Sequence, residues 1–311
     1  MDNPKYTFLI PAYKATYLEE ALRRIQNQVF TSFRVIVSDD DSPEDIKTIV
    51  DAFVDDSRFV YRRNEENIGG KSLVNHWNLL LSLCQTDYLI MASDDDFYEP
   101  NFLLEIEYLV NKYPNTNMYR GRMGAYDNTL NEIKLDKKLR ESVTQKEYLE
   151  DFFGLNFCKC MANFVFKTQA LRDAGGFFEM PLAWFSDEIT SLIMSRKGCC
   201  NTKEIVFHFR VSGINISNSI PTPSSAYKKA IATIRAVKWL DHYIKTIDGV
   251  SPLFARKACE RWTMLLYEWL NLINFGDFIK ILPSVVSLDY IEWSKIHPVI
   301  NHQLKSFFVR K

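Results

Sequence analysis

Short apolar runs alternate with segments of helical periodicity over the first hundred residues. Apolar residues at helical spacing predict helices over Tyr17–Gln28, from Ser42 onwards with its hydroxyl as the cap, over Lys71–Cys84 and over Asn101–Tyr113. This alternation is typical of βαβ units, so we expect an α/β fold with a Rossmann-like, mixed and mostly parallel sheet flanked by helices. The apolar runs themselves, rich in β-branched and aromatic residues, predict strands at Tyr6–Ile10, Arg34–Ser38, Phe59–Arg62 and Tyr88–Ala92.

The middle of the chain is less regular but carries recognisable start and stop signals. Thr144 and Glu147 have the spacing of a capping box, which predicts a short helix that ends near Phe153. Residues 163–177 predict a strand followed by a short helix, which is capped by Thr168 and stopped by Gly175-Gly176. An amphipathic helix is predicted over 184–198, ending at Gly198, and a last strand at Ile205–Phe209.

A Pro, Thr and Ser cluster at Ile220–Ser225 marks a change of composition and is interpreted as a linker. Beyond it the pattern is helical, over Ala226–Ile247 and over Pro252–Phe275, with Ser251 as a cap and Gly276 as a stop. We therefore expect a catalytic domain over residues 1–222 and a helical C-terminal region over 223–311.

Charge and composition narrow the class of protein. The 311 residues have a net charge of −1 and 47% hydrophobic content, so nothing global directs the chain to nucleic acid. Residues 224–311 carry 13 basic and 7 acidic side chains, and this tail could rest on an anionic membrane or form a homodimer interface. With neither a secretory signal nor an apolar run of about 20 residues, a cytoplasmic protein is expected, at most lying at the inner face of the membrane.

The six cysteines form no CxxC pair. Reduced and mostly buried thiols are therefore favoured over a zinc site or a disulfide framework.

Two clusters of acidic residues follow predicted strands, at Asp39–Asp41 and at Asp94–Asp96. Ligands of open α/β sheets bind beyond the carboxyl ends of the strands, so we expect both clusters in one crevice. Carboxylates gathered there can hold Mg²⁺ or Mn²⁺, which prefer oxygen ligands and bridge to substrate phosphates. The alternative is that these aspartates only form turns and helix caps, which becomes less favoured when the pattern occurs twice.

Six stretches of the chain, in order, resemble the motifs of family 2 glycosyltransferases, inverting enzymes of the GT-A fold that use nucleotide-activated sugars. The resemblance extends from about Tyr6 to Ser219. The stretches are FLIPAYKATYLEEALRRIQNQ (8–28), VIVSDDDSPED (35–45), NEENIGGKSLVNHWN (64–78), DYLIMASDDDFYEP (87–100), KTQALRDAGGF (167–177) and SDEITSLIMSRKG (186–198).

The resemblance implies a donor site. Asp40 would accept a hydrogen bond from a uracil N–H, which favours a UDP-sugar, while Asp41 replaces the family's usual glycine. Lys71, after Gly69 at the start of a predicted helix, could reach a phosphate or simply be solvated. The residues implied for the nucleobase and ribose are Pro11, Ala12, Tyr13, Asp39 and Asp40.

The resemblance also implies a divalent metal, Mn²⁺ or Mg²⁺, at the second acidic cluster. Ser93 takes the place of the family's first acidic residue, Asp95 would be the direct ligand, and Asp96 would complete the charge. Asp94 would contact the ribose or a metal-bound water. The metal would neutralise the charge that develops on the diphosphate as the sugar leaves.

A catalytic base is implied 11 residues before a glycine, and Asp187 stands 11 residues before Gly198. Glu188 is the alternative base, and a purely structural first-turn acid is the alternative role for Asp187. Arg210 matches a basic residue that approaches the diphosphate in the family's closing loop (207–219). Ser212 stands where that loop often has a histidine, which leaves a third protein ligand to the metal open.

These features favour transfer of a hexose-type sugar to a hydroxyl acceptor, a glycan or a lipid-linked sugar, in the synthesis of a bacterial surface polysaccharide or glycolipid. A sugar-phosphate nucleotidyltransferase is one alternative, but residues 8–16 lack its Gly-rich basic loop. A receiver-like signalling module is another, but its acids follow the first strand rather than the second. The chain has no GxxxxGK[ST] loop, which argues against a P-loop enzyme.

Overall fold

The computed structural model describes residues 4–213 and 220–309. The chain divides into two compact units. The first unit comprises Met1–Glu179 and Asp187–Asn218, and the second comprises Met180–Ser186 and Ser219–Lys311. A short internal segment, Met180–Ser186, therefore belongs with the C-terminal helices.

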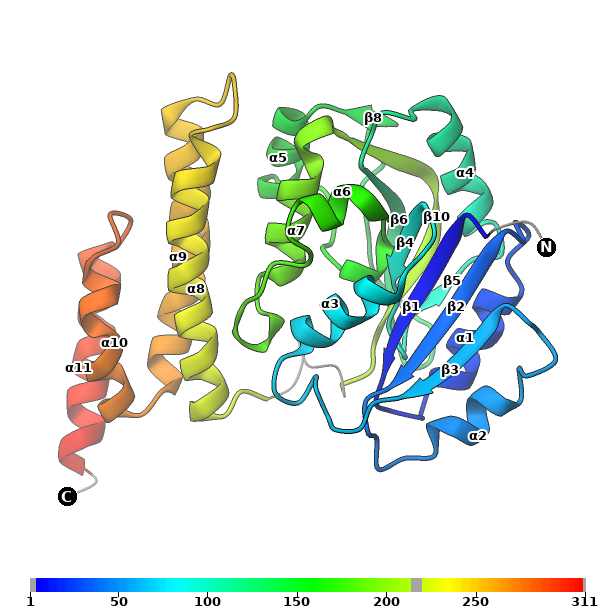
Figure 1. The fold of residues 1–311 in the computed structure, drawn as a ribbon. Coiled ribbons are helices and arrows are strands. Elements are labelled where there is room, and N and C mark those ends of the chain that lie inside the picture. The colour runs from blue at the N-terminus through cyan, green and yellow to red at the C-terminus, as the bar shows by residue number, and fades with distance from the viewer. Residues whose placement is uncertain (1–3, 214–219, 310–311) are drawn as a thin grey trace. The chain divides into compact units, whose positions relative to one another are not determined.

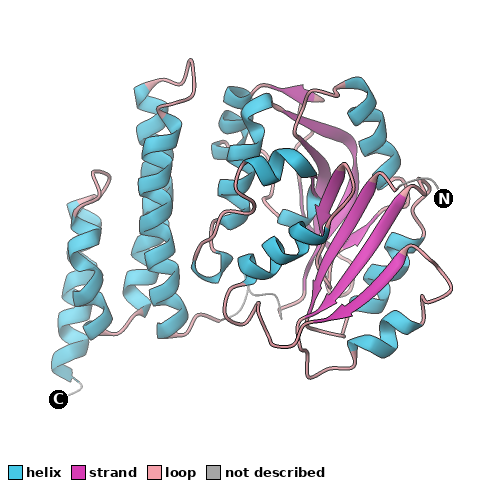
Figure 2. Ribbon diagram, viewed as in Figure 1, coloured by secondary structure: helices cyan, strands magenta, loops and turns pink. Residues whose placement is uncertain are grey.

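The first unit is built around one mixed sheet, seen as the magenta arrows in Figure 2. The first four strands in sequence pair in parallel with one another, whereas the strand Phe164–Lys167 runs antiparallel to both of its neighbours. The fold class predicted from the sequence is confirmed. In spatial order the strands are β3 (Phe59–Arg63), β2 (Phe33–Asp39), β1 (Tyr6–Ala12), β4 (Tyr88–Met91), β9 (Phe164–Lys167), β6 (Met118–Asp127), β10 (Cys199–Val211) and β5 (Phe97–Tyr98), with β7 (Glu132–Leu135) beside β6 and β8 (Ser142–Val143) beside β10.

Helices cover the sheet on both faces (Figure 1). Tyr6, Phe8 and Ile10 of β1 point to one face, where they share a core with α1 (Leu18–Gln26), α2 (Ile46–Asp51) and α4 (Phe102–Lys112). Burial on both faces explains why the inner strands are almost continuously apolar. The other helices of the first unit are α3 (Leu73–Leu83), α5 (Gln145–Phe153), α6 (Thr168–Asp173) and α7 (Ser186–Met194), whose first residue the division assigns to the second unit.

The second unit is helical, as Figure 2 shows. Small residues of α8, among them Ala226, Ala230 and Val237, are buried together with Leu266 and Leu270 of α9, and the two helices pack side by side. None of the helices in the described residues is long and apolar enough to cross a bilayer. The helices are α8 (Pro223–Ile244), α9 (Pro252–Leu272), α10 (Phe275–Val286) and α11 (Trp293–Val309).

Three predicted helix boundaries are wrong, and at two of them the side chain expected as the cap contacts another partner, the Tyr13 carbonyl for Ser42 and the Cys84 thiol for Thr168. Helix α2 begins at Ile46, capped by the side chain of Asp45, while the Ser42 hydroxyl donates to the carbonyl of Tyr13. Thr168 is the first residue of α6 and provides no capping hydrogen bond. Helix α9 ends at Leu272, and the glycine predicted to stop it lies within α10.

Two kinds of local signal behave as predicted. The capping box of Thr144 and Glu147 forms at the start of α5. Gly175 and Gly176 have φ of 91° and 84°, left-handed values that end α6, and Gly198 has φ of 82° after α7. Glycine favours this region because it lacks a Cβ.

Candidate functional site

The carboxyl ends of β1, β2 and β4 lie next to one another, because β1 pairs in parallel with both other strands. The loops that follow these strands are joined directly. The Asp94 carboxylate accepts hydrogen bonds from the backbone N–H groups of Tyr13, at 3.2 Å, and Lys14, at 3.1 Å. The backbone N–H of Asp40 in turn donates to the carbonyl of Ala12. The structure thus brings the two acidic clusters to one sheet edge, beside Pro11–Tyr13.

Asp39 is fully buried and held by cationic and phenolic donors. Its Oδ2 accepts from the Tyr61 hydroxyl at 2.7 Å and from Arg63 Nη1 at 2.6 Å, and its Oδ1 accepts from the Ser42 backbone N–H. Burial, followed by the hydrogen bond to Asp39, raises the pKa of Tyr61. Asp41 has φ of 54°, the left-handed region that glycine favours, and binds the same arginine. An aspartate thus adopts the conformation of the glycine that it replaces.

Asp40 organises the loop after β3. Its Oδ1 accepts from the backbone N–H of Ile68 at 3.0 Å and from Asn64, and its Oδ2 accepts from the backbone N–H of Gly69 at 2.6 Å. A Cβ at Gly69 would lie 2.7 Å from that Oδ2, so only glycine fits this close approach. The buried His76 lies 3.5 Å from Asp40 Oδ2, and burial lowers the pKa of its imidazole.

Lys71 lies beyond this loop at the surface. Its ammonium pairs with Glu66 at 2.5 Å, and both side chains are exposed. A phosphate role for Lys71 stays a prediction.

The second acidic cluster is tightly held at Asp96. The Ser93 hydroxyl donates to its Oδ2 at 2.6 Å, and the Arg210 backbone N–H donates to its Oδ1 at 2.9 Å. Burial, followed by the negative charge of Asp95, raises the pKa of Asp96 to about 8. Burial, followed by the charge of Asp94, raises the pKa of Asp95 to about 6. Three carboxyl groups thus share a space in which their charges repel one another.

Arg210 lies beside this cluster and is 3% exposed. Its Nε donates to the carbonyl of Asp95 at 3.0 Å, and its Nη2 donates to Glu20 of α1 at 2.7 Å. The guanidinium carbon lies 4.3 Å from the ring centroid of Tyr17. Arg210 therefore ties β10 and α1 to the acidic loop, with two partners, Glu20 and Tyr17, that sequence reasoning missed. A contact of Arg210 with a diphosphate stays a prediction.

Asp187 lies in the first turn of α7, where its Oδ1 accepts from the backbone N–H of Glu188 at 3.0 Å. Burial, followed by the charge of Asp187, raises the pKa of Glu188 well above its ordinary value. The Sγ of Cys160 lies 3.9 Å from Asp96 Oδ2. Burial raises the pKa of this thiol, and the charges of Asp96, Asp187 and Asp95 raise it further. Asp187 and the acidic cluster are thus within electrostatic reach of one thiol, which no sequence signal had indicated.

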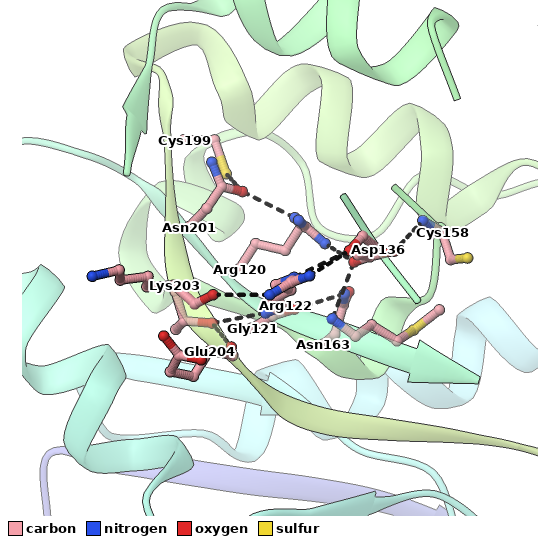
Figure 3. A network of polar contacts seen from close by, with 12 residues as sticks. Arg120, Gly121, Arg122, Asp136, Cys158, Asn163, Cys199, Asn201, Lys203 and Glu204 are labelled. Atoms are coloured by element: carbon pink, nitrogen blue, oxygen red, sulfur yellow. Dashed lines mark hydrogen bonds and ion pairs between the residues drawn. The ribbon is translucent and has the colours of Figure 1, made fainter. Parts of the chain in front are cut away.

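A buried ion pair joins neighbouring strands of the sheet (Figure 3). Arg120 Nη1 lies 2.5 Å from Asp136 Oδ2, and Arg120 Nε donates to Asn201 of β10. Asp136 also accepts from the backbone N–H groups of Met123, at 3.0 Å, and Cys158, at 2.6 Å. The pair therefore holds β6, β10 and the segment that leads to Cys160 in one arrangement.

The acidic cluster offers the ligand chemistry of a hard divalent cation. Among residues 4–213 and 220–309, no group of three or more His, Cys, Asp or Glu side chains is placed to hold a metal ion. Mg²⁺ and Mn²⁺ are commonly held by one or two carboxylates together with substrate phosphates, so aspartates at a sheet edge fit such a cation when the substrate supplies the other oxygens. Asp96 accepts hydrogen bonds from protein donors with both oxygens. Metal binding by Asp95 stays a prediction.

Comparisons with known proteins agree on the fold. A family model described as "Glycosyl transferase family 2" matches residues 7–175. A Campylobacter jejuni protein named GalNAc(5)-diNAcBac-PP-undecaprenol beta-1,3-glucosyltransferase is 33% identical over 95 residues, which are 30% of this chain and 30% of that protein. The poly(ribitol-phosphate) beta-N-acetylglucosaminyltransferase TarS of Staphylococcus aureus is 20% identical over 317 residues, 96% of this chain and 53% of that protein. The chain thus spans about half or less of these curated relatives.

Two solved structures extend the comparison. S. aureus TarS 1-349 in complex with UDP-GlcNAc has a TM-score of 0.59 and 14% identity, with 92% of this chain and 89% of that one covered. The mannosyltransferase PcManGT from Pyrobaculum calidifontis in complex with GDP-Man and Mn²⁺ has a TM-score of 0.54 and 14% identity, with 98% and 81% covered. At this identity the likeness concerns the fold.

Proposed function

The chain belongs to glycosyl transferase family 2, whose model matches over half of it, and from this premise we propose that it transfers a hexose-type sugar from a nucleotide-diphospho-sugar to an acceptor hydroxyl, with inversion. The observation that carries the proposal is the meeting of the Asp39–Asp41 and Asp94–Asp96 loops at one sheet edge, beside Pro11–Tyr13. Family membership argues against both a nucleotidyltransferase and a receiver-like module.

The donor is proposed to be a UDP-sugar. Asp39 and Asp40 would form the nucleobase and ribose site together with Pro11, Ala12 and Tyr13. In support, the Asp40 carboxylate is fixed by three protein donors and so has one defined direction in which to meet a base. The similar TarS structure is in complex with UDP-GlcNAc. The similar mannosyltransferase is in complex with GDP-Man, so the choice between UDP and GDP needs a direct test.

Asp95, with Asp94 and Asp96 beside it, would hold Mn²⁺ or Mg²⁺. When bound, the cation supplies positive charge that offsets the negative charge on the leaving diphosphate. Asp94 and Asp95 give this part of the site negative charge, and Arg210 keeps their loop in place from the side of β10.

The Asp187 carboxylate would accept a hydrogen bond from the acceptor hydroxyl and then take its proton, as a general base. The hydroxyl oxygen then forms a bond to the anomeric carbon as the bond from that carbon to the diphosphate oxygen breaks. The proton ends on Asp187, and the electron pair of the broken bond leaves with the nucleoside diphosphate. Attack on the face opposite the leaving group inverts the anomeric centre. Glu188, whose pKa is raised by burial and by the charge of Asp187, stays the alternative base.

The acceptor class is proposed from the relatives. The name of one relative specifies a poly(ribitol-phosphate) acceptor and that of the other a glycan on PP-undecaprenol. Both names support a polysaccharide or glycolipid product for this chain. A cytoplasmic location stays a prediction. Peripheral membrane contact and homodimer formation through the C-terminal helices stay predictions.

Thermal unfolding in the presence of nucleotides tests the donor assignment. We expect UDP with Mn²⁺ to raise the unfolding temperature more than GDP with Mn²⁺, and more than UDP with a chelator. A ligand present at about 100 times its Kd raises the free energy of unfolding by about 2.7 kcal/mol, and thermal unfolding can measure a change of this size. A larger shift with GDP overturns the UDP assignment, and the absence of a shift with either nucleotide overturns the donor site.

A further inference from the structure

Three side chains of the second unit form a cluster around a buried lysine, here called the lysine–tryptophan cluster: Lys229, Trp184 and Trp269. Lys229 of α8 is 4% exposed. Its Nζ lies 4.3 Å from the ring centroid of Trp184 and 4.7 Å from that of Trp269. The two rings are 5.3 Å apart and nearly perpendicular, at 88°. The ammonium therefore lies against two indoles from different parts of the chain.

The cluster has hydrogen-bond donors without acceptors. Within the described part of the chain, the Nε1 atoms of Trp184 and Trp269 are buried and have no hydrogen-bond partner, as is true of the Oγ of Ser186 in the same segment as Trp184. No carboxylate there pairs with Lys229, and burial alone lowers the pKa of its ammonium. Buried polar groups in folded proteins are almost always paired, so two unpaired donors around one cation indicate a missing acceptor.

The backbone of this segment gives a second, independent signal. Leu182, Ala183 and Phe185 have φ of 57°, 54° and 72°, values that side chains with a Cβ rarely adopt. Leu182 and Ala183 belong to a short 3₁₀ turn, η2 (Pro181–Ala183), and the Phe185 ring packs 4.6 Å from that of Trp262. Such strain persists only where the surroundings enforce it, and it gathers at ligand clamps and active sites.

We propose that the lysine–tryptophan cluster is a subsite for a phosphate group of the acceptor. Phosphate oxygens are acceptors only, and they complement an ammonium and two indole N–H groups. The indole faces suit the carbon side of a sugar or polyol attached to that phosphate. Ser186 directly precedes Asp187, and consecutive Cα atoms lie about 3.8 Å apart.

This assignment rests on the proposed function, because Asp187 is its base. It narrows the acceptor to a phosphate-bearing molecule, either a polyol phosphodiester or a lipid pyrophosphate.

Direct titration of the full chain tests the subsite with two soluble probes, glycerophosphoglycerol for the phosphodiester and farnesyl diphosphate for the lipid pyrophosphate. Both are added with UDP and Mn²⁺ in excess, and tryptophan fluorescence and calorimetry report binding. We expect saturable binding of one of the two probes, which identifies the source of the phosphate. Lys229→Met should weaken that binding at least about tenfold, since a hydrogen bond to a charged group is lost.

Lys228→Met is the matched control, because Lys228 is the preceding residue of the same helix and is exposed. It should change the affinity less than about twofold, as expected for a solvated charge. Trp184→Phe keeps an aromatic ring but removes one N–H donor, and it should weaken binding several-fold even if Lys229→Met fails to fold. The subsite is overturned by any of three results. They are an equal loss of probe affinity in the two lysine variants, full probe affinity in Trp184→Phe, and no saturable binding of either probe by the wild-type chain.

The donor site is measured separately, by UDP binding to the wild-type chain without a phosphate probe. If UDP binds and neither probe does, the subsite falls and the proposed function stands. If a probe binds in the Lys229-dependent manner and UDP does not, the donor assignment falls and the phosphate site remains.

Discussion

The acidic residues at the sheet edge differ in how much of each carboxylate the protein itself uses. Asp39, Asp40 and Asp96 have both oxygens engaged by protein donors, several of them backbone N–H groups. Such bonds fix the direction of a carboxylate and keep neighbouring loops together. Asp187 accepts a hydrogen bond from the backbone N–H of the next residue. The fixed carboxylates thus hold the loops together, and the catalytic role of Asp187 stays a prediction.

Replacing Asp187 with Asn tests this division. We expect kcat to fall by about 10²–10⁴, the usual contribution of a general base, because an amide cannot take the acceptor proton. The Kd for UDP should remain within twofold of the wild-type value, since Asp187 takes no part in the proposed donor site. Glu188→Gln is the matched control and should lower kcat much less. Turnover by Asp187→Asn within tenfold of wild type would instead make Glu188 the base.

Gly69→Ala tests the role of Asp40. The added Cβ would lie 2.7 Å from a carboxylate oxygen that three protein donors hold in place, so Asp40 has to move. We expect the Kd for UDP to rise at least tenfold, equivalent to about 1.4 kcal/mol. Gly70→Ala is the control. Its Cβ would meet the end of the Asn67 side chain, which is partly exposed and can rotate away. Similar Kd values for the two variants, by calorimetry, would contradict the role of Asp40.

The positions of the acidic residues could be predicted, but most of their partners could not. Asp40 and Asp95 follow apolar runs, and parallel strands place such residues at one edge. Tyr61, Arg63 and Glu20 reach the site from other strands and helices, through the register of the sheet. Cys160 is a single cysteine in an irregular segment. Nothing in a periodic pattern encodes such pairings, because they depend on the three-dimensional arrangement.

At the scale of elements, prediction succeeded where the pattern is local and failed where distant contacts decide. The strands β1 to β4 are apolar and flanked by turns, and all four were predicted. β6 was missed because it contains two arginines and two glycines, and its Arg120 is buried only by virtue of Asp136. The helix expected from Ser42 begins later because that hydroxyl donates to the loop after β1. Tertiary bonds thus override local propensity.

The buried pair of Arg120 and Asp136 makes a prediction about stability. Asp136→Asn leaves the Arg120 charge buried without its partner and should lower the free energy of unfolding by about 3–5 kcal/mol. The double variant Arg120→Met with Asp136→Leu removes both charges, and it should lower the free energy of unfolding less than Asp136→Asn does. Urea denaturation measures both values. A double variant less stable than Asp136→Asn would show that hydrogen bonds to the backbone, rather than the unpaired charge, dominate.

For the whole molecule, two units with opposite charge emerge from a nearly neutral chain. Residues 224–311 carry a net charge of +6, and the rest of the chain carries −7, including the acidic site. Composition alone averages these two regions to −1. The assignment of Met180–Ser186 to the second unit was not predicted, since a seven-residue segment between two predicted elements carries no signal of its partners. Its tryptophan reveals the grouping through contacts with α8 and α9.

The proposed donor site lies in the first unit, so ligand binding should protect defined parts of the chain from hydrogen exchange. UDP with Mn²⁺ stabilises the segments that it contacts, and their amides should exchange more slowly. We expect protection in the loops after β1, β2 and β4 and in the segment 64–71, where Asp40 holds backbone N–H groups. Chelation of the metal should reverse the protection after β4 first, since Asp95 is the proposed ligand. The α10 and α11 helices serve as internal references, and protection confined to them would move the nucleotide to the second unit.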